Sequence, residues 1–215
     1  TKNHCCGNTA GRESRPLMRF ALSESAAKQR KGRNRTEMNI NNKVENHAKI
    51  PTETERKFLI RMPDPAFLAT CPGARFDKIR QVYLRRGEGG SVRIRRRACG
   101  NGEVRYTETR KRRVSGFTCE EYERDITGDE YNRLLSLSDP TRRPIEKTRW
   151  CVPFGERLLE IDIYPFWTKT AILEIELPDE AAAFSIPDWL SIIREVSREP
   201  AYRNASLACR IPPEE

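Results

Sequence analysis

The stretch that decides the fold is Glu53-Thr54-Glu55-Arg56-Lys57-Phe58-Leu59-Ile60. In a β-strand, alternate side chains point to the same face, so Glu53, Glu55 and Lys57 would share one surface. Two carboxylates roughly 4 Å apart repel by about 4 kcal/mol at an effective dielectric near 20. A cation between them relieves that repulsion. The motif therefore indicates either half of a divalent metal site or the solvated edge face of a sheet.

The same alternation returns in six further stretches, and each of them carries charges of mainly one sign. The cations alternate at Arg93, Arg95 and Arg97, at Lys111, and at Lys147 and Arg149. The carboxylates alternate at Glu121, Glu123 and Asp125, at Glu160 and Asp162, and at Glu174 and Glu176. A sheet with one wet face also alternates polar and apolar residues. Strands sorted by sign that face one space indicate instead a cavity that holds a polyanion together with metal ions.

The ordered set of these motifs resembles the CYTH, or triphosphate tunnel metalloenzyme, superfamily over about residues 51–210. The motifs that carry the resemblance are Glu53-x-Glu55-x-Lys57, Val92-Arg93-Ile94-Arg95, Thr109-x-Lys111, Glu121-x-Glu123, Glu146-Lys147-Thr148-Arg149-Trp150, Leu159-Glu160-Ile161-Asp162 and Leu173-Glu174-Ile175-Glu176-Leu177. The tail from Pro187 to Asn204 looks like the bacterial branch. The resemblance implies a mainly β (α+β) fold, a closed eight-stranded antiparallel barrel that forms a tunnel, with a few peripheral helices.

The apolar and charged patterns place the elements of such a barrel. Strands are expected near 52–61, 76–86, 90–98, 103–113, 118–126, 143–152, 156–164 and 169–177. Glycine-rich turns at 87–90 and 100–102 make residues 76–113 a three-stranded meander. Helices are expected near 64–70, 128–137 and 187–197. Closure removes exposed strand edges, and mutually repelling charged walls would keep the interior wet.

The resemblance implies metal-dependent hydrolysis of a small-molecule triphosphate, most simply inorganic tripolyphosphate. The triphosphate would be bound by Lys57, Arg93, Arg95, Lys111, Lys147 and Arg149, because guanidinium and ammonium groups match phosphate oxygens. Mg²⁺ or Mn²⁺ would be held by Glu53, Glu55, Glu121, Glu123, Asp162, Glu174 and Glu176. Glu53, Glu55 and Lys57 are the candidate catalytic residues, acting through a metal-activated water.

Charge divides the chain into two expected parts, a basic extension over residues 1–49 and the tunnel domain over residues 50–212. The first 49 residues carry 11 Lys and Arg against 4 Glu, which leaves 29 against 27 for the remainder. The extension lacks apolar periodicity, so we expect a disordered tail. A nucleic-acid-binding arm and an organellar transit peptide are the alternatives.

Histidine and cysteine usage narrows the chemistry. His4 and His47 both lie in the extension, so the tunnel domain cannot use a catalytic histidine or an imidazole metal site. The seven cysteines show no C-x-x-C spacing and indicate reduced thiols in a cytoplasm.

No segment reaches a membrane-spanning length. The inward faces nearly lack aromatics, which argues against nucleic acid as partner. The oligomeric state stays open, a homodimer included.

Two departures from the family pattern leave the substrate open. Many relatives carry an arginine where this chain has Cys119, and the segment 164–169 lacks a glycine often found there. Arg203 could reach the tunnel from the C-terminal segment, although a surface position is the favoured interpretation. The alternative functions are a class IV-type adenylate cyclase, a thiamine or nucleoside triphosphatase, and a non-catalytic polyphosphate-binding module.

Overall fold

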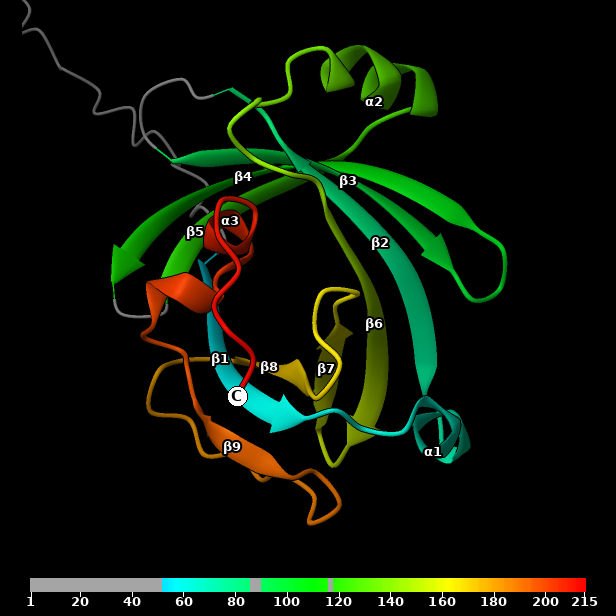
Figure 1. Cartoon of the computed structure of the whole chain (residues 1–215), viewed down its shortest axis with the longest axis vertical. Coiled ribbons are helices and arrows are strands. Elements are labelled where there is room, and N and C mark those ends of the chain that lie inside the picture. The colour runs from blue at the N-terminus through cyan, green and yellow to red at the C-terminus, as the bar shows by residue number, and fades with distance from the viewer. Residues whose placement is uncertain (1–51, 86–89, 116–117) are drawn as a thin grey trace, which may run out of the picture. The chain divides into compact units, whose positions relative to one another are not determined.

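Eight antiparallel strands close into a barrel in the computed structural model, which describes residues 52–85, 90–115 and 118–215. The strands are β1 (Thr52–Arg61), β2 (Arg75–Tyr83), β3 (Ser91–Cys99), β4 (Val104–Ser115), β5 (Thr118–Asp125), β6 (Ile145–Phe154), β7 (Arg157–Ile163) and β8 (Thr170–Leu177). Their order around the barrel is β1-β5-β4-β3-β2-β6-β7-β8, and β8 pairs with β1 again. The expected barrel and the meander β2-β3-β4 are confirmed (Figure 1). The extension 1–49 and most of the turn at 87–90 lie outside the described residues.

The barrel closes through a short contact between β1 and β5. Thr52, Glu53 and Thr54 are the register partners of Glu120, Cys119 and Thr118, whereas β1 pairs with β8 over the eight residues from Thr54 to Arg61. The two strands diverge beyond Thr54, which leaves the edge of β1 without β5 as a partner. The C-terminal segment pairs with this part of β1 instead.

The helix expected near 187–197 is wrong, because this segment supplies a further strand, β9 (Ile192–Glu195). β9 pairs with β1 at Phe58, Leu59 and Ile60, where β5 no longer does. An unpaired strand edge presents free N–H and C=O groups, and β9 satisfies them at the cost of the helix. Apolar periodicity could not reveal this competition, since it depends on where β1 and β5 separate.

Four short helical segments complete the fold. They are α1 (Pro65–Thr70), α2 (Gly128–Leu135), the 3₁₀ turn η1 (Pro200–Tyr202) and α3 (Asn204–Leu207). The two helices expected near 64–70 and 128–137 are confirmed. Asp64 caps α1 by accepting from the Ala66 N–H at 2.9 Å, and Thr127 caps α2 by accepting from the Glu130 N–H at 3.1 Å. Within the described ranges, no helix is long and apolar enough to cross a membrane.

Most apolar packing lies outside the barrel, which leaves the interior polar. Leu173 and Ile175 alternate with the inward Glu174 and pack in a cluster with Leu68 of α1. Full burial of each such side chain contributes about 1.5–3 kcal/mol. A second cluster lies under α2 around Ile94 and Tyr131. The outer faces therefore hold the barrel together, and its inner face is free to carry charge.

A third cluster joins the C-terminal segment to the barrel interior beyond Lys57. Leu59, the next inward residue of β1, packs with Tyr164, Tyr202 and Leu207, and all four are buried. Figure 1 shows η1, α3 and the chain end lying over the opening of the barrel. The C-terminal segment thus covers one part of the interior and brings residues 203–205 to its wall.

Candidate functional site

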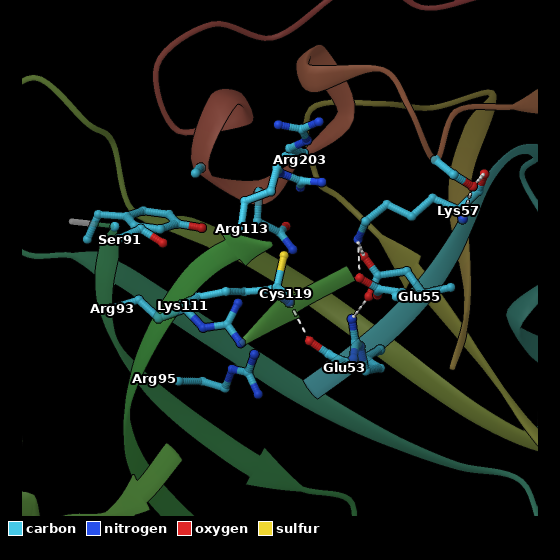
Figure 2. A pocket seen from close by; sticks show the side chains of 17 residues that line it. Glu53, Glu55, Lys57, Ser91, Arg93, Arg95, Lys111, Arg113, Cys119 and Arg203 are labelled. Atoms are coloured by element: carbon cyan, nitrogen blue, oxygen red, sulfur yellow. Dashed lines mark hydrogen bonds and ion pairs between the residues drawn. The ribbon is translucent and has the colours of Figure 1, made fainter. Parts of the chain in front are cut away.

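The barrel encloses a charged cavity of about 270 Å³. Eight of the thirteen residues predicted for the site line this cavity: Glu53, Glu55, Lys57, Arg93, Arg95, Lys111, Arg149 and Glu174. They come from β1, β3, β4, β6 and β8, and Figure 2 shows Arg93, Arg95 and Lys111 opposite the carboxylates of β1. The predicted sorting of charge by strand therefore produces two facing walls.

The cationic wall is built by alternation along β3 and β4. Arg93 and Arg95 face inward, and Lys111 lies across from Ser91 on the neighbouring strand. Burial, reinforced by repulsion from Arg93 and Arg149, lowers the pKa of Arg95 to about 10. Arg95 has one ion-pair partner among the described residues, Glu123 at 3.9 Å, and its Nε is buried without a partner there. Such an incompletely compensated guanidinium favours an added anion.

The carboxylate wall combines acidic groups of β1 and β8. Glu55 and Lys57 are the register partners of Glu176 and Glu174. The pKa of Glu55 is raised to about 8. Burial is the main cause, and repulsion from Glu174 outweighs attraction to Lys57. Burial would lower the pKa of Lys57, but Glu174 and Glu55 outweigh it and raise this pKa. Lys57 therefore stays charged and Glu55 holds a proton at neutral pH.

One ion pair, between Lys111 and Glu53, joins the two walls, and other ion pairs surround it. Lys111 Nζ contacts a Glu53 carboxylate oxygen and lies 3.0 Å from Glu121 Oε2, and Arg93 Nη2 lies 3.3 Å from Glu121 Oε1. Lys57 Nζ contacts Glu174 and lies 3.1 Å from Glu55 Oε2. The cations proposed to bind phosphate and the carboxylates proposed to bind metal thus neutralise one another in this structure.

Lys147 and Asp162 lie beneath the cavity wall rather than on it. Both side chains are fully buried and contact each other. Arg149 donates to both carboxylate oxygens of Asp162 from Nε and Nη2, each at 2.7 Å, and also contacts Glu174 and Glu160. Burial and the nearby Arg149 lower the pKa of Lys147 to about 8. This network holds Arg149 and Glu174 in place, and the predicted roles of Lys147 in phosphate binding and of Asp162 in metal binding stay predictions.

Three other predicted carboxylates also lie off the cavity wall. Glu121 stands behind Arg93 and Lys111, which it pairs with. Glu123 and Glu176 are exposed, and the Thr109 hydroxyl donates to Glu123 at 2.6 Å. Burial, with repulsion from Glu53 and Glu160, raises the pKa of Glu176. Of these three, Glu176 adjoins the wall most directly, through its register partner Glu55.

The cavity also has lining residues that the motifs did not predict. Arg113 and Cys119, register partners on β4 and β5, line it together with Tyr83 and Ser91. Ser197, Arg203, Asn204 and Ala205 line it from the C-terminal segment. Arg113 shares the parity of Thr109 and Lys111, so alternation along β4 was a signal for it. No sequence pattern signalled the C-terminal residues beyond the candidate Arg203, because the fold of that segment decides their position.

The cavity fits a hard divalent cation by its donor chemistry. Glu53, Glu55 and Glu174 offer carboxylate oxygens, the ligands that Mg²⁺ and Mn²⁺ prefer. Burial and the neighbouring Glu174 raise the pKa of Glu55, so a cation added at this wall would favour the ionised carboxylate. Within the described ranges, no three acidic, histidine or cysteine side chains converge as a metal site as they stand, since Lys57 and Lys111 hold these carboxylates.

Fold and site together define a closed β-barrel protein with opposed cationic and acidic walls around one cavity, as the resemblance to the CYTH superfamily implies. The chain is 33% identical over 158 residues to an inorganic triphosphatase of Acetivibrio thermocellus, an alignment that covers 72% of this chain and 92% of that protein. The chain belongs to this inorganic triphosphatase family of the CYTH superfamily. No family model matches the chain.

Comparison with solved structures finds two further proteins to report. The crystal structure of the inorganic triphosphatase NE1496 is 28% identical, with coverage of 75% of this chain and 97% of that one and a TM-score of 0.47. The putative adenylyl cyclase HpAC1 from Hippeastrum, described as having a dominant triphosphatase activity, is 17% identical, with coverage of 59% and 80% and a TM-score of 0.40.

Proposed function

We propose that the protein hydrolyses the terminal phosphoanhydride bond of inorganic tripolyphosphate inside the barrel cavity, with Mg²⁺ or Mn²⁺. The observation that carries this proposal is the pair of facing walls, with Arg93, Arg95 and Lys111 on one side and Glu53 and Glu55 on the other. A triphosphate with its metal ion presents both charges at once. Membership of the inorganic triphosphatase family supports the same reaction.

The residues of the cationic wall would bind and orient the phosphate oxygens. Arg93 and Arg95 offer planar donor groups suited to two oxygens at a time, and Lys57 and Lys111 act as mobile point charges. Arg149 reaches the cavity from β6 and is held in place by Asp162. Phosphoryl transfer needs mainly positioning and charge neutralisation, and a wall fixed by strand pairing supplies both.

The acidic wall would hold the metal through Glu53, Glu55 and Glu174, with Glu176 adjoining. When bound, a divalent ion neutralises phosphate charge and orients the attacking water. Lys57 and Lys111 must leave these carboxylates to do so, and phosphate oxygens are the partners they would gain. The proton on Glu55 must also leave, so we expect metal binding to release a proton.

The cavity favours an inorganic triphosphate over a nucleoside triphosphate. Tyr83 is the only aromatic residue among the described residues that line the cavity. Base recognition in proteins commonly uses stacking on aromatic side chains, and one buried ring offers little surface for it. A cyclase would also need to hold a ribose next to the scissile bond. These considerations place ATP and thiamine triphosphate behind tripolyphosphate as substrates.

The free thiols of Cys71, Cys99, Cys119, Cys151 and Cys209 support a reducing compartment, and we place the protein in the cytoplasm on that basis. Mass spectrometry with and without an alkylating reagent, on protein prepared from cells under quenching conditions, would test it. Disulfide-linked peptides involving these residues would contradict the assignment.

The test of function is phosphate release from tripolyphosphate, ATP and thiamine triphosphate, with Mg²⁺ or Mn²⁺ and with chelator. We expect metal-dependent release that is fastest for tripolyphosphate. Arg95→Ala should lower kcat/KM by about 10²- to 10³-fold, the usual effect of removing one charge-stabilising donor. Arg96→Ala is the matched control, because Arg96 is the next residue of β3 and has the opposite parity. Pyrophosphate and a cyclic nucleotide from ATP would instead establish a cyclase, and binding without turnover would establish a binding module.

A further inference from the structure

The main chain of Lys57 lies at the point where β9 begins to cover the edge of β1. The ladder between these two strands includes Phe58 but not Lys57. One residue after β9, the Val196 N–H donates to the Lys57 carbonyl oxygen at 2.8 Å. The Lys57 N–H donates instead to a side chain, the Ser197 hydroxyl, at 2.9 Å. A serine thus takes the place of a main-chain acceptor at the residue that carries the inward ammonium group.

The Ser197 hydroxyl is oriented by a second hydrogen bond. A hydroxyl has one proton and two acceptor lone pairs. Ser197 Oγ lies 2.6 Å from Glu195 Oε1, closer than its 3.4 Å to the Lys57 carbonyl oxygen, so the proton points to Glu195. Arg56 holds that carboxylate, because its Nε donates to the same oxygen at 2.8 Å. An acceptor lone pair of Ser197 is therefore left for the Lys57 N–H.

Ser197 is buried at the cavity wall. Its exposed fraction is 6%, and it lines the same cavity as Lys57. A main-chain N–H that is enclosed by protein and loses its acceptor is strongly disfavoured. If the hydroxyl were removed, β1 would move at Lys57 until water or another acceptor met the N–H. The hydrogen bond to Ser197 therefore fixes the main chain of β1 at this residue.

The position of this main chain decides where the Lys57 ammonium group can reach. Lysine carries its charge on a flexible stem, so the place and direction of the Cα–Cβ bond set the region that Nζ can occupy. In this structure Nζ contacts Glu174 and lies 3.1 Å from Glu55 Oε2. Under the proposed function it leaves these carboxylates for oxygens of the phosphate that reacts. A displacement of about 1 Å near the reacting atoms can lower a rate about 100-fold.

We infer that Ser197 is a positioning residue for Lys57, and that the segment after β9 completes the reaction site through it. This inference rests on the proposed function. The hydroxyl acts on the main chain of β1 and does not itself donate to phosphate, because Glu195 takes its proton. The phosphate groups keep the cations of β3 and β4 as partners. Loss of the hydroxyl should therefore lower the rate of hydrolysis and leave substrate binding nearly intact.

The test measures kcat and KM for tripolyphosphate with Mg²⁺ and the full chain. Ser197→Ala should lower kcat about tenfold and change KM less than about twofold, because the ammonium group is displaced but not lost. Ser197→Thr keeps the hydroxyl, so its kcat should stay within about twofold of the wild-type value. Ser191→Ala is the matched control, because Ser191 is an exposed serine directly before β9. This control should change neither constant.

A second variant tests the same hydrogen bond from outside the barrel. Glu195→Ala removes the acceptor that orients the hydroxyl. The Glu195 side chain is 37% exposed, so its loss leaves the core intact. The Ser197 proton is then free to turn to the Lys57 carbonyl oxygen, and the hydroxyl holds the N–H less firmly. We expect kcat to fall about threefold with KM unchanged. Wild-type values of kcat in both Ser197→Ala and Glu195→Ala would overturn the inference.

A merely structural effect of Ser197 is separated from positioning by a destabilised control. Leu68→Ala leaves a gap in the cluster outside the barrel, so it should lower the urea midpoint at least as far as Ser197→Ala does, while its kcat stays within about twofold of wild type. A fall in kcat that follows the urea midpoint in both variants overturns the inference. A rise in KM with kcat retained also overturns it, because Ser197 would then be a substrate-binding residue. Wild-type protein that releases no phosphate contradicts the proposed function itself.

Discussion

Replacing Glu55 by Gln should stabilise the metal-free protein while it destroys activity. Glu55 lies in the cavity beside Glu174, and burial raises its pKa from an ordinary value of 4.5 to about 8. The folded protein therefore retains a proton that the unfolded chain releases between these two values. Stability must fall as pH rises across that window. Glutamine is neutral and can donate to Glu174, so the variant escapes this loss.

The magnitude follows from the size of the shift. One pKa unit corresponds to about 1.4 kcal/mol, so the penalty on the folded state reaches about 4 kcal/mol by pH 7.5 as an upper bound and is below about 1 kcal/mol at pH 5. The side chain of Glu55 is only 15% exposed, so solvent screening removes little of this effect. We expect the variant to gain stability over wild type chiefly at the higher pH.

The assay is urea unfolding of the full chain in chelator at pH 5 and pH 7.5. The informative quantity is the difference in unfolding free energy between Glu55→Gln and wild type, because other titrating groups contribute equally to both. Glu156→Gln serves as control, since Glu156 is exposed in the turn after β6. A difference that stays constant between the two pH values would refute the reasoning. Phosphate release should fall at least 100-fold in the same variant, because a proposed metal ligand is lost.

Three further predictions test other parts of the site. The apparent affinity for Mg²⁺ or Mn²⁺ should rise about ninefold from pH 6 to pH 7 and about fivefold from pH 7 to pH 8, because Glu55 must lose its proton. Calorimetry that shows no proton release on metal binding would contradict this. Asp162→Asn should lower the unfolding free energy by about 3–5 kcal/mol, because it removes the carboxylate that the buried Lys147 contacts and leaves Arg149 with Glu160 and Glu174 as its anionic partners. Denaturant unfolding of this variant, with the exposed Asp188→Asn as control, measures the loss. A loss of stability below about 1 kcal/mol would contradict the prediction. Alkylation of Cys119 should block turnover, because the added group would fill the cavity. Bound tripolyphosphate should protect the enzyme from this inactivation, and the variant Cys119→Ala should keep its activity in the presence of the reagent. Equal inactivation of Cys119→Ala would assign the effect to another cysteine.

The barrel could be predicted from sequence because its rule is local. Period-two alternation of charged and apolar residues assigns each inward side chain without knowledge of its partners. Arg93, Arg95 and Lys111 reach the cavity by parity alone. The same rule, applied one repeat further along β4, would also have included Arg113. Where strand pairing decides position, the sequence pattern was sufficient.

Depth below the surface of the cavity could not be predicted in the same way. Parity places Lys147 and Asp162 on the inner face, as it does Arg149, but only Arg149 reaches the cavity. Both residues pack against the buried Tyr164, whose hydroxyl lies 3.4 Å from Asp162 Oδ2 and whose ring centroid lies 5.8 Å from Lys147 Nζ. The C-terminal strand was missed for a related reason. The segment forms a strand because part of the edge of β1 is free to pair with it. That free edge exists only once the barrel has closed.

The ion pairs across the cavity explain why metal and triphosphate should bind together. Glu53 is held by Lys111, and Glu174 by Lys57. An anion that took Lys57 and Lys111 alone would leave the half-buried Glu53 without Lys111 and the buried Glu174 with Arg149 as its remaining cation, and a cation that took the carboxylates alone would leave the half-buried Lys57 and Lys111 without these anions. Either outcome costs several kcal/mol. The metal–triphosphate complex compensates both walls at once, so each ligand should raise the affinity for the other by the same factor. Opposed walls that neutralise each other thus discriminate against free phosphate and free metal alike, which a cavity of one sign could not do.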